Sequence, residues 1–146
     1  MKYISKSIEE TAKLAEKVLA DLKPQIRATV LALYGDLGSG KTTFVQQLGK
    51  LLGIKRSLQS PTFVIMKNYT LKGATFSHFI HIDAYRLQSE AELTQLGFAE
   101  LLKDPRNLIA LEWAERVEGL LPADALRIRF KFVDDTTREI EFDNKG

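Results

Sequence analysis

The 146-residue sequence contains no cysteine. This absence excludes disulfide bonds, thiolate nucleophiles and thiolate metal sites, and it is typical of proteins of a reducing cytoplasm. No apolar run within residues 1–22 is long enough for a signal peptide or a membrane-spanning helix, and the charges there are of both signs. We therefore expect a cytoplasmic protein that is not embedded in a membrane.

An excess of charge of one sign is also lacking. The chain has 21 basic and 19 acidic residues, a net charge of +2, which does not by itself predict binding to nucleic acid. Hydrophobic residues make up 45% of the chain, an ordinary share for a globular protein. A chain of this length buries about two-thirds of its unfolded surface. We expect one folded domain over residues 1–146.

Two capping boxes, Ser7 with Glu10 and Ser89 with Glu92, predict where helices begin. Apolar periodicity and turn residues then predict helices over 8–22, 41–52, 90–102 and 114–121, and strands over 28–34, 62–70, 75–82, 107–111, 126–132 and 138–142. Helices that alternate with buried strands indicate an α/β fold with a parallel core. The expected hairpins at 62–82 and 126–142 add antiparallel strands, so we predict a mixed sheet in a three-layer fold.

The segment from Gly35 to Thr42, GDLGSGKT, matches the phosphate-binding pattern G-x-x-x-x-G-K-[ST]. A predicted buried strand precedes it and a predicted helix follows, which is the context that this motif requires. Its glycines allow backbone N–H groups to approach phosphate oxygens, and the helix adds its positive end. Lys41 can reach the β- and γ-phosphates and the Thr42 hydroxyl can ligate magnesium. The segment predicts a nucleoside triphosphate site in a P-loop NTPase fold.

A P-loop site needs a carboxylate at the end of a nearby strand to hold the magnesium ion. Asp83 and Glu112 each follow a short apolar run, so the pattern does not rank them, and both can serve. Thr62 follows Ser-Pro and is a candidate sensor of the γ-phosphate. We expect Trp113 to pack, and we expect His81 to lie on the opposite strand face from His78 and to form no metal pair with it.

The guanine-selecting sequence Asn-Lys-x-Asp is also missing, so ATP is the expected nucleotide. Three functions fit the site: an ATPase that drives a partner, a small-molecule kinase, and a nucleotide-binding module without catalysis. A kinase usually needs a lid that closes over the phosphates, and no insertion long enough for one is visible. Arg127, Arg129 and Lys131 alternate along one strand, and we expect them to form the solvated face of an edge hairpin rather than a tRNA contact.

Four motifs in this order and spacing resemble the TsaE family, also called YjeE. They are GDLGSGKTTF at 35–44, SPTF at 60–63, HIDAYRL at 81–87 and LEWAE at 111–115, and the sequence EETAKLA at 9–15 agrees as well. The resemblance extends over nearly the whole chain and weakens after Pro122. Members of this family are bacterial ATPases that support formation of threonylcarbamoyladenosine at position 37 of tRNAs, together with a TsaB–TsaD pair in which TsaD is the transferase.

The resemblance implies a role for this chain as the ATP-hydrolysing accessory of such a complex, with tRNA reached through the partners. It implies that Thr42 and Glu112 hold Mg²⁺, and that Asp83 and Thr62 lie in switch-like segments that hydrolysis requires. Together with Lys41 these are the expected catalytic residues. It also implies that the helix around Thr11 approaches the nucleotide. The expected ATP contacts are Thr11, Gly38, Ser39, Gly40, Lys41, Thr42 and Thr43.

Overall fold

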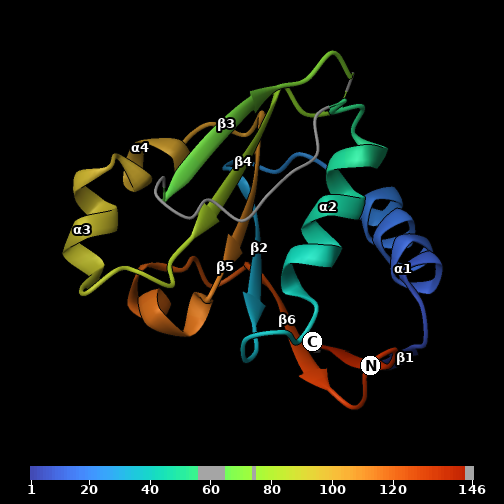
Figure 1. Cartoon of the computed structure of the whole chain (residues 1–146). Coiled ribbons are helices and arrows are strands. Elements are labelled where there is room, and N and C mark those ends of the chain that lie inside the picture. Colours follow the sequence, from blue (N-terminus) through green and yellow to red (C-terminus); the bar gives the residue numbers. More distant parts are fainter. Residues whose placement is uncertain (56–64, 74, 144–146) are drawn as a thin grey trace.

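The computed structural model describes residues 1–55, 65–73 and 75–143, in which a seven-stranded sheet lies between two layers of helices (Figure 1). The strand order is β1-β7-β6-β2-β5-β4-β3. The strands are β1 (Lys2–Ser5), β2 (Thr29–Tyr34), β3 (Met66–Thr70), β4 (His78–Asp83), β5 (Asn107–Glu112), β6 (Leu126–Phe132) and β7 (Arg138–Phe142).

The centre of the sheet is parallel and both of its edges are antiparallel. Strands β6, β2, β5 and β4 run parallel, while β3 pairs antiparallel with β4, and β7 with both β6 and β1. The carboxyl ends of parallel strands meet at one edge of a sheet, where open α/β folds bind their ligands. The predicted α/β fold of P-loop NTPases, with a mixed sheet and a parallel core, is confirmed.

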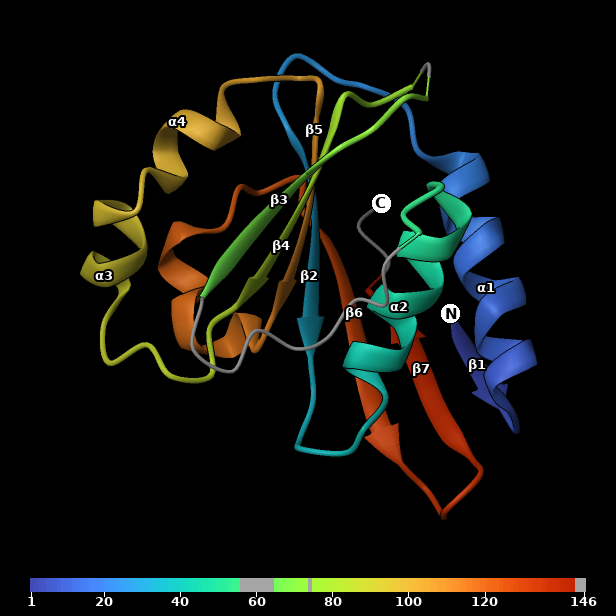
Figure 2. The same ribbon diagram turned by 45° about the horizontal axis from the view of Figure 1, so that its top comes forward.

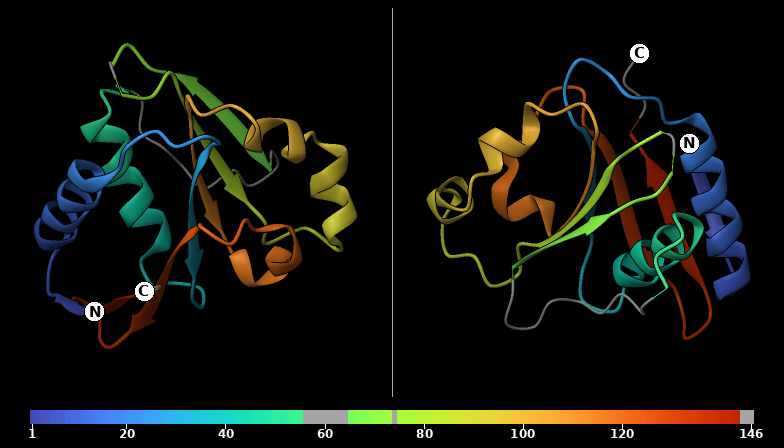
Figure 3. Two further views of the ribbon diagram at one scale, coloured as in Figure 1. Left: turned by 180° about the vertical axis from the view of Figure 1, so that it is seen from behind. Right: turned by 90° about the horizontal axis from the view of Figure 1, so that it is seen from above.

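Helices cover both faces of the sheet. On one side lie α1 (Ile8–Asp21) and α2 (Lys41–Leu51), and on the other lie α3 (Glu90–Gln95), α4 (Phe98–Leu102) and the 3₁₀ helix η1 (Ala114–Leu120), as Figures 2 and 3 show from other directions. Strand β2 is buried on both faces because Leu31 and Leu33 pack under α1 and α2, while Val30 and Ala32 face the other layer. None of the described helices is long and apolar enough to cross a membrane.

The helix starts follow the predicted caps only in part. The Ser7 hydroxyl accepts a 3.1 Å hydrogen bond from the Glu10 backbone, as the capping box requires. The capping box predicted at Ser89 is wrong for its serine, because the Ser89 side chain makes no capping hydrogen bond. The helix that begins there has only six residues. The single helix predicted over 90–102 is also wrong. It is divided at Gly97, whose φ of 89° is left-handed and ends a helical path.

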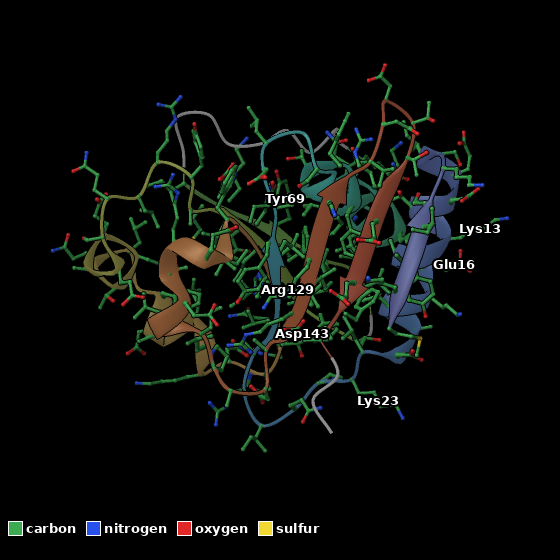
Figure 4. The ribbon with its side chains drawn as sticks, turned by 90° about the horizontal axis from the view of Figure 1, so that it is seen from below. Lys13, Glu16, Lys23, Tyr69, Arg129 and Asp143 are labelled. Carbon is green, nitrogen blue, oxygen red and sulfur yellow. The ribbon has the colours of Figure 1, made fainter. Side chains whose placement is uncertain are left out.

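The C-terminal hairpin confirms the expected solvated basic face only in part: Arg129 and Lys131 are exposed, but Arg127 is buried and the hairpin is not at the edge of the sheet. Strand β6 lies inside the sheet, between β7 and β2, so it is not an edge strand. Arg127 is buried and bonds Glu118 at 3.3 Å, and Arg129 pairs with Asp143 at 3.2 Å (Figure 4). The edge strand on this side is β1, which the sequence patterns did not predict because its residues, KYIS, neither alternate nor form an apolar run.

Candidate functional site

The loop at 35–40 connects β2 to α2 and depends on glycine for its shape. Gly35 has a φ of 143°, and a Cβ atom there would lie 2.5 Å from the carbonyl oxygen of Phe130. Gly40 has a φ of 107° and is the N-cap of α2, where no side chain makes a capping hydrogen bond. Because the N-cap residue has no side chain to accept from them, the first N–H groups of α2 are available to a ligand, and with the helix dipole they favour an anion at this end.

Lys41 begins α2, and its side chain lies over the loop. Its Nζ donates hydrogen bonds to loop carbonyl oxygens, among them that of Asp36 at 2.9 Å, and lies 4.1 Å from the ring centroid of Trp113. Burial lowers the pKa of Lys41, and the nearby carboxylates, with Glu115 and Glu112 foremost, act in the opposite direction. The site therefore holds a cation at the phosphate loop with no carboxylate hydrogen-bonded to its Nζ among the described residues.

Glu112 ends β5 and is held by two side chains. The Thr42 hydroxyl donates a 2.8 Å hydrogen bond to Glu112 Oε1, and His81 Nε2 lies 2.6 Å from Glu112 Oε2. The side chains of His81 and Glu112 are 0% and 2% exposed, and His81 Nδ1 has no hydrogen-bond partner among the described residues. Among the described residues, Nε2 is the His81 ring nitrogen with a hydrogen-bond partner, and that partner is Glu112 Oε2. The other carboxylate oxygen of Glu112 faces Thr42.

The strand order ranks the two acids that the sequence pattern left equal. Asp83 is the register partner of Glu112 on the neighbouring strand, so both side chains leave the same face at the same height. Strand β5, however, lies next to β2, whereas β4 is one strand further away. Glu112 therefore contacts Thr42, while an Asp83 oxygen accepts a 3.0 Å bond from the backbone of Tyr85.

A cavity of about 380 Å³ opens over these groups. Residues 37–43, from the loop and the first turn of α2, line one side of it, which brings together the expected nucleotide contacts from Gly38 to Thr43. Asp83, Arg86 and Glu112 line it from the strand ends. Thr62, the remaining expected catalytic residue, lies outside the described residues.

Thr11 belongs to a second, neighbouring cavity of about 300 Å³. Thr11 is buried on α1, and its hydroxyl oxygen lies 2.7 Å from that of Ser5. The second cavity lies between the start of α1 and the β6–β7 hairpin, and it shares Gly40, Thr43 and Arg138 with the first. The structure thus places Thr11 apart from the other expected nucleotide contacts but next to their cavity.

The donor set of the first cavity fits a hard divalent cation. The Thr42 hydroxyl and the carboxylates of Glu112 and Asp83 all offer oxygen, the atom that Mg²⁺ prefers. No group of three or more His, Cys, Asp or Glu side chains suited to a metal ion occurs among the described residues. Mg²⁺ takes few ligands from protein and the rest from water and phosphate, so a hydroxyl and one or two carboxylates are enough for it.

Three residues of the site were not predicted from the sequence. Trp113 packs against Tyr85, with ring centroids 4.9 Å apart, but it also lies over Lys41 and has a positive φ of 59°. Arg138 reaches the loop from β7. His81 contacts Glu112, for which the available signal was that His81 and Asp83 share one face of a strand.

A family model described as threonylcarbamoyl adenosine biosynthesis protein TsaE matches residues 5–140. A protein of Bacillus subtilis named tRNA threonylcarbamoyladenosine biosynthesis protein TsaE is 38% identical over all of this chain and 87% of its own length. Proteins of the same name from Rickettsia conorii and Treponema pallidum are 38% and 32% identical, over 90% and 96% of this chain and 71% and 98% of their own lengths. The crystal structure of Bacillus subtilis YdiB is similar, with a TM-score of 0.75 and 34% identity over 97% of this chain and 83% of that one.

Proposed function

The chain belongs to the TsaE family, and from this membership and the geometry of the site we propose that it is an ATPase of tRNA threonylcarbamoyladenosine formation. It binds ATP with Mg²⁺ and hydrolyses it in the cytoplasm. Hydrolysis supports a TsaB–TsaD type complex, in which a different chain transfers the threonylcarbamoyl group to adenosine 37. Relatives that bear the name of this biosynthesis support the pathway, and the first cavity supports the activity.

The observation that carries the ATPase proposal is the contact of Thr42 with Glu112 directly beside the phosphate loop. The loop glycines and the start of α2 supply N–H groups for the β- and γ-phosphates, and Lys41 supplies positive charge. A hydroxyl and a carboxylate at the edge of that cradle are the two protein ligands that a nucleotide-bound Mg²⁺ requires. A phosphate-binding turn with a purely structural role would not need them.

The Thr42 hydroxyl and the Glu112 carboxylate would hold the Mg²⁺ ion, with Asp83 close by. When bound, the ion neutralises charge on the phosphate oxygens. Asp83, with its carboxylate in the same cavity, orients the water that attacks the γ-phosphate, and Thr62 precedes the strand that pairs with β4. The second cavity receives the adenosine end of the nucleotide beside Thr11.

The proposed activity depends on partners. We expect the isolated chain to bind ADP and ATP and to turn ATP over slowly, and we expect the TsaB–TsaD pair with tRNA to increase turnover. Binding can be followed through Trp113, the single tryptophan, because it lies over Lys41. Hydrolysis can be followed by phosphate release with and without the partners and tRNA.

The matched variants are Lys41→Ala and Lys50→Ala, since both lysines belong to α2 but only Lys41 is buried at the loop. Lys41→Ala should abolish nucleotide binding and Lys50→Ala should leave it unchanged. Equal ATP hydrolysis with and without the partners would refute the coupling. Transfer of labelled phosphate from ATP to a metabolite would show a kinase instead, and no hydrolysis under any condition would leave a binding module.

A further inference from the structure

Arg138 on β7 lies across the phosphate loop, although 100 positions of sequence separate it from Gly38. Its Nε donates a 3.1 Å hydrogen bond to the Gly38 carbonyl oxygen. Its aliphatic stem covers Gly40, where a Cβ atom would lie 3.3 Å from Arg138 Cγ. Figure 2 shows the β6–β7 hairpin beside the loop that enters α2. The hairpin thus brings a guanidinium group to the loop from a part of the chain that carries no nucleotide motif.

The charge of Arg138 is not neutralised by any acid in the described part of the chain. Its Nη1 donates to the backbone carbonyl oxygens of Asp134 and Thr137, at 2.6 and 3.0 Å. Within residues 1–55, 65–73 and 75–143, no carboxylate lies within ion-pair distance of it and Nη2 has no hydrogen bond. The hairpin's other arginines differ, because Arg127 pairs with Glu118 and Arg129 with Asp143. The guanidinium also lies over the Phe132 ring, 4.7 Å from its centroid. A half-buried cation that contacts only carbonyl groups and an aromatic ring retains its charge for an anionic ligand.

The position of Arg138 between the two cavities indicates which part of a bound nucleotide it would contact. Arg138, Gly40 and Thr43 line both cavities. A nucleotide with its β- and γ-phosphates beside Lys41 and its base beside Thr11 would cross the boundary between the cavities at its α-phosphate and ribose. We infer that the Arg138 guanidinium binds the nucleotide there, at the α-phosphate and adjoining ribose. This assignment rests on the proposed nucleotide site and adds a contact to it.

The α-phosphate is common to ADP and ATP, which distinguishes this role from that of an arginine acting on the γ-phosphate. Arg138→Met retains the stem over Gly40 and removes the guanidinium. It should weaken binding of ADP and of a non-hydrolysable ATP analogue by the same factor, roughly 10-fold for one charge-assisted contact. Arg138→Lys should recover part of the loss, since it restores the charge without the planar fork.

The measurement is the change of Trp113 fluorescence on titration with ADP and with the ATP analogue, at several salt concentrations. Arg129→Met is the matched control, because Arg129 lies on the same hairpin but pairs with Asp143 and lines neither cavity. It should retain the affinity and salt dependence of the unmodified protein. Arg138→Met should bind ADP with a weaker salt dependence, because one positive charge no longer contributes. Thermal unfolding of each variant separates lost binding from lost folding.

Each result decides the assignment. Unchanged ADP affinity in Arg138→Met would overturn it, as would a loss confined to the ATP analogue or a loss with unchanged salt dependence, which would mean that Arg138 only shapes the loop. If the unmodified protein bound neither nucleotide, the proposed function and this assignment would fall together. If the unmodified protein bound both nucleotides and Arg138→Met bound them equally well, this assignment alone would be refuted.

Discussion

Thr42 on α2 donates a 2.8 Å hydrogen bond to Glu112 at the end of β5, across 70 positions of sequence. The bond connects the phosphate loop to the strand beside β2 and sets a hydroxyl and a carboxylate next to each other at the mouth of the cavity. His81 Nε2 contacts the second oxygen of the same carboxylate at 2.6 Å. The positions of Thr42, Glu112 and His81 therefore depend on one another. Substitutions of these residues should have different effects on metal binding and on stability.

Glu112→Gln should raise the Mg²⁺ concentration needed for half-maximal ATP hydrolysis by roughly 10- to 100-fold, the range seen for losses around metal sites. Glutamine retains the volume and can still accept from Thr42, but it lacks the negative charge that attracts the ion. Titration of hydrolysis with Mg²⁺ measures the shift, and ADP affinity without Mg²⁺ should not fall. Glu100→Gln is the control, because that side chain is 77% exposed. An unchanged Mg²⁺ requirement in Glu112→Gln would assign the ion to another acid.

His81→Leu should lower the free energy of unfolding by about 3 kcal/mol, because it leaves a buried Glu112 oxygen without its donor. The double variant His81→Leu with Glu112→Leu should recover part of that loss, since no unpaired carboxylate then remains. Urea denaturation of the two single variants and the double variant measures the coupling. Additive losses would show that the two side chains do not stabilise each other.

Gly35→Ala should destabilise the fold by about 1–3 kcal/mol, because a Cβ atom would approach the Phe130 carbonyl at 2.5 Å on a backbone with φ of 143°. Gly73→Ala is a suitable control, since no atom of the described residues is within 4 Å of a Cβ atom there. The comparison is made by urea denaturation and by ADP binding. Equal stability in the two variants would contradict the close approach of the loop to β6.

Tyr34→Phe should reduce the fall in the free energy of unfolding that the unmodified protein shows at alkaline pH. Burial and the hydrogen bond from the Tyr34 hydroxyl to Glu118 raise the pKa of Tyr34 from 10.0 to about 12. The unfolded chain therefore releases this proton at lower pH than the folded protein, and the free energy of unfolding falls as pH rises from 10 to about 12.

Urea denaturation across that range measures the slope, which should be smaller in Tyr34→Phe. Tyr85→Phe, at a position that is 46% exposed, should retain the slope of the unmodified protein. Equal slopes in Tyr34→Phe and the unmodified protein would assign the alkaline loss to other groups.

Most of the fold could be predicted from the sequence because it is encoded locally. The apolar run of β2, the glycines of the loop and the cap at Ser7 each act within a few residues, and the structure agrees with each of them. The helix break at Gly97 was missed because apolar periodicity continues through it, whereas the left-handed backbone there interrupts the hydrogen bonds.

The site could be predicted as a set of residues but not as an arrangement. Asp83 and Glu112 each follow a short apolar run and are equivalent in the sequence, and only the strand order, with β5 next to β2, selects Glu112 for Thr42. Arg138 belongs to no motif and lies beside the loop only because β7 pairs with β6. Contacts of this kind depend on tertiary packing, which spacing along the chain does not specify.

The pairing of β1 with β7 has a consequence for the order of folding. The Met1 amino group bonds the Phe142 carbonyl oxygen, 141 positions away, so β1 finds its partner strand only after nearly all of these residues have been synthesised. Such distant contacts carry the largest loop-closure cost and form late. Arg138 lies on the same strand, β7. A nascent chain on the ribosome therefore lacks the Arg138 contact with the phosphate loop until β7 has emerged and paired with β6.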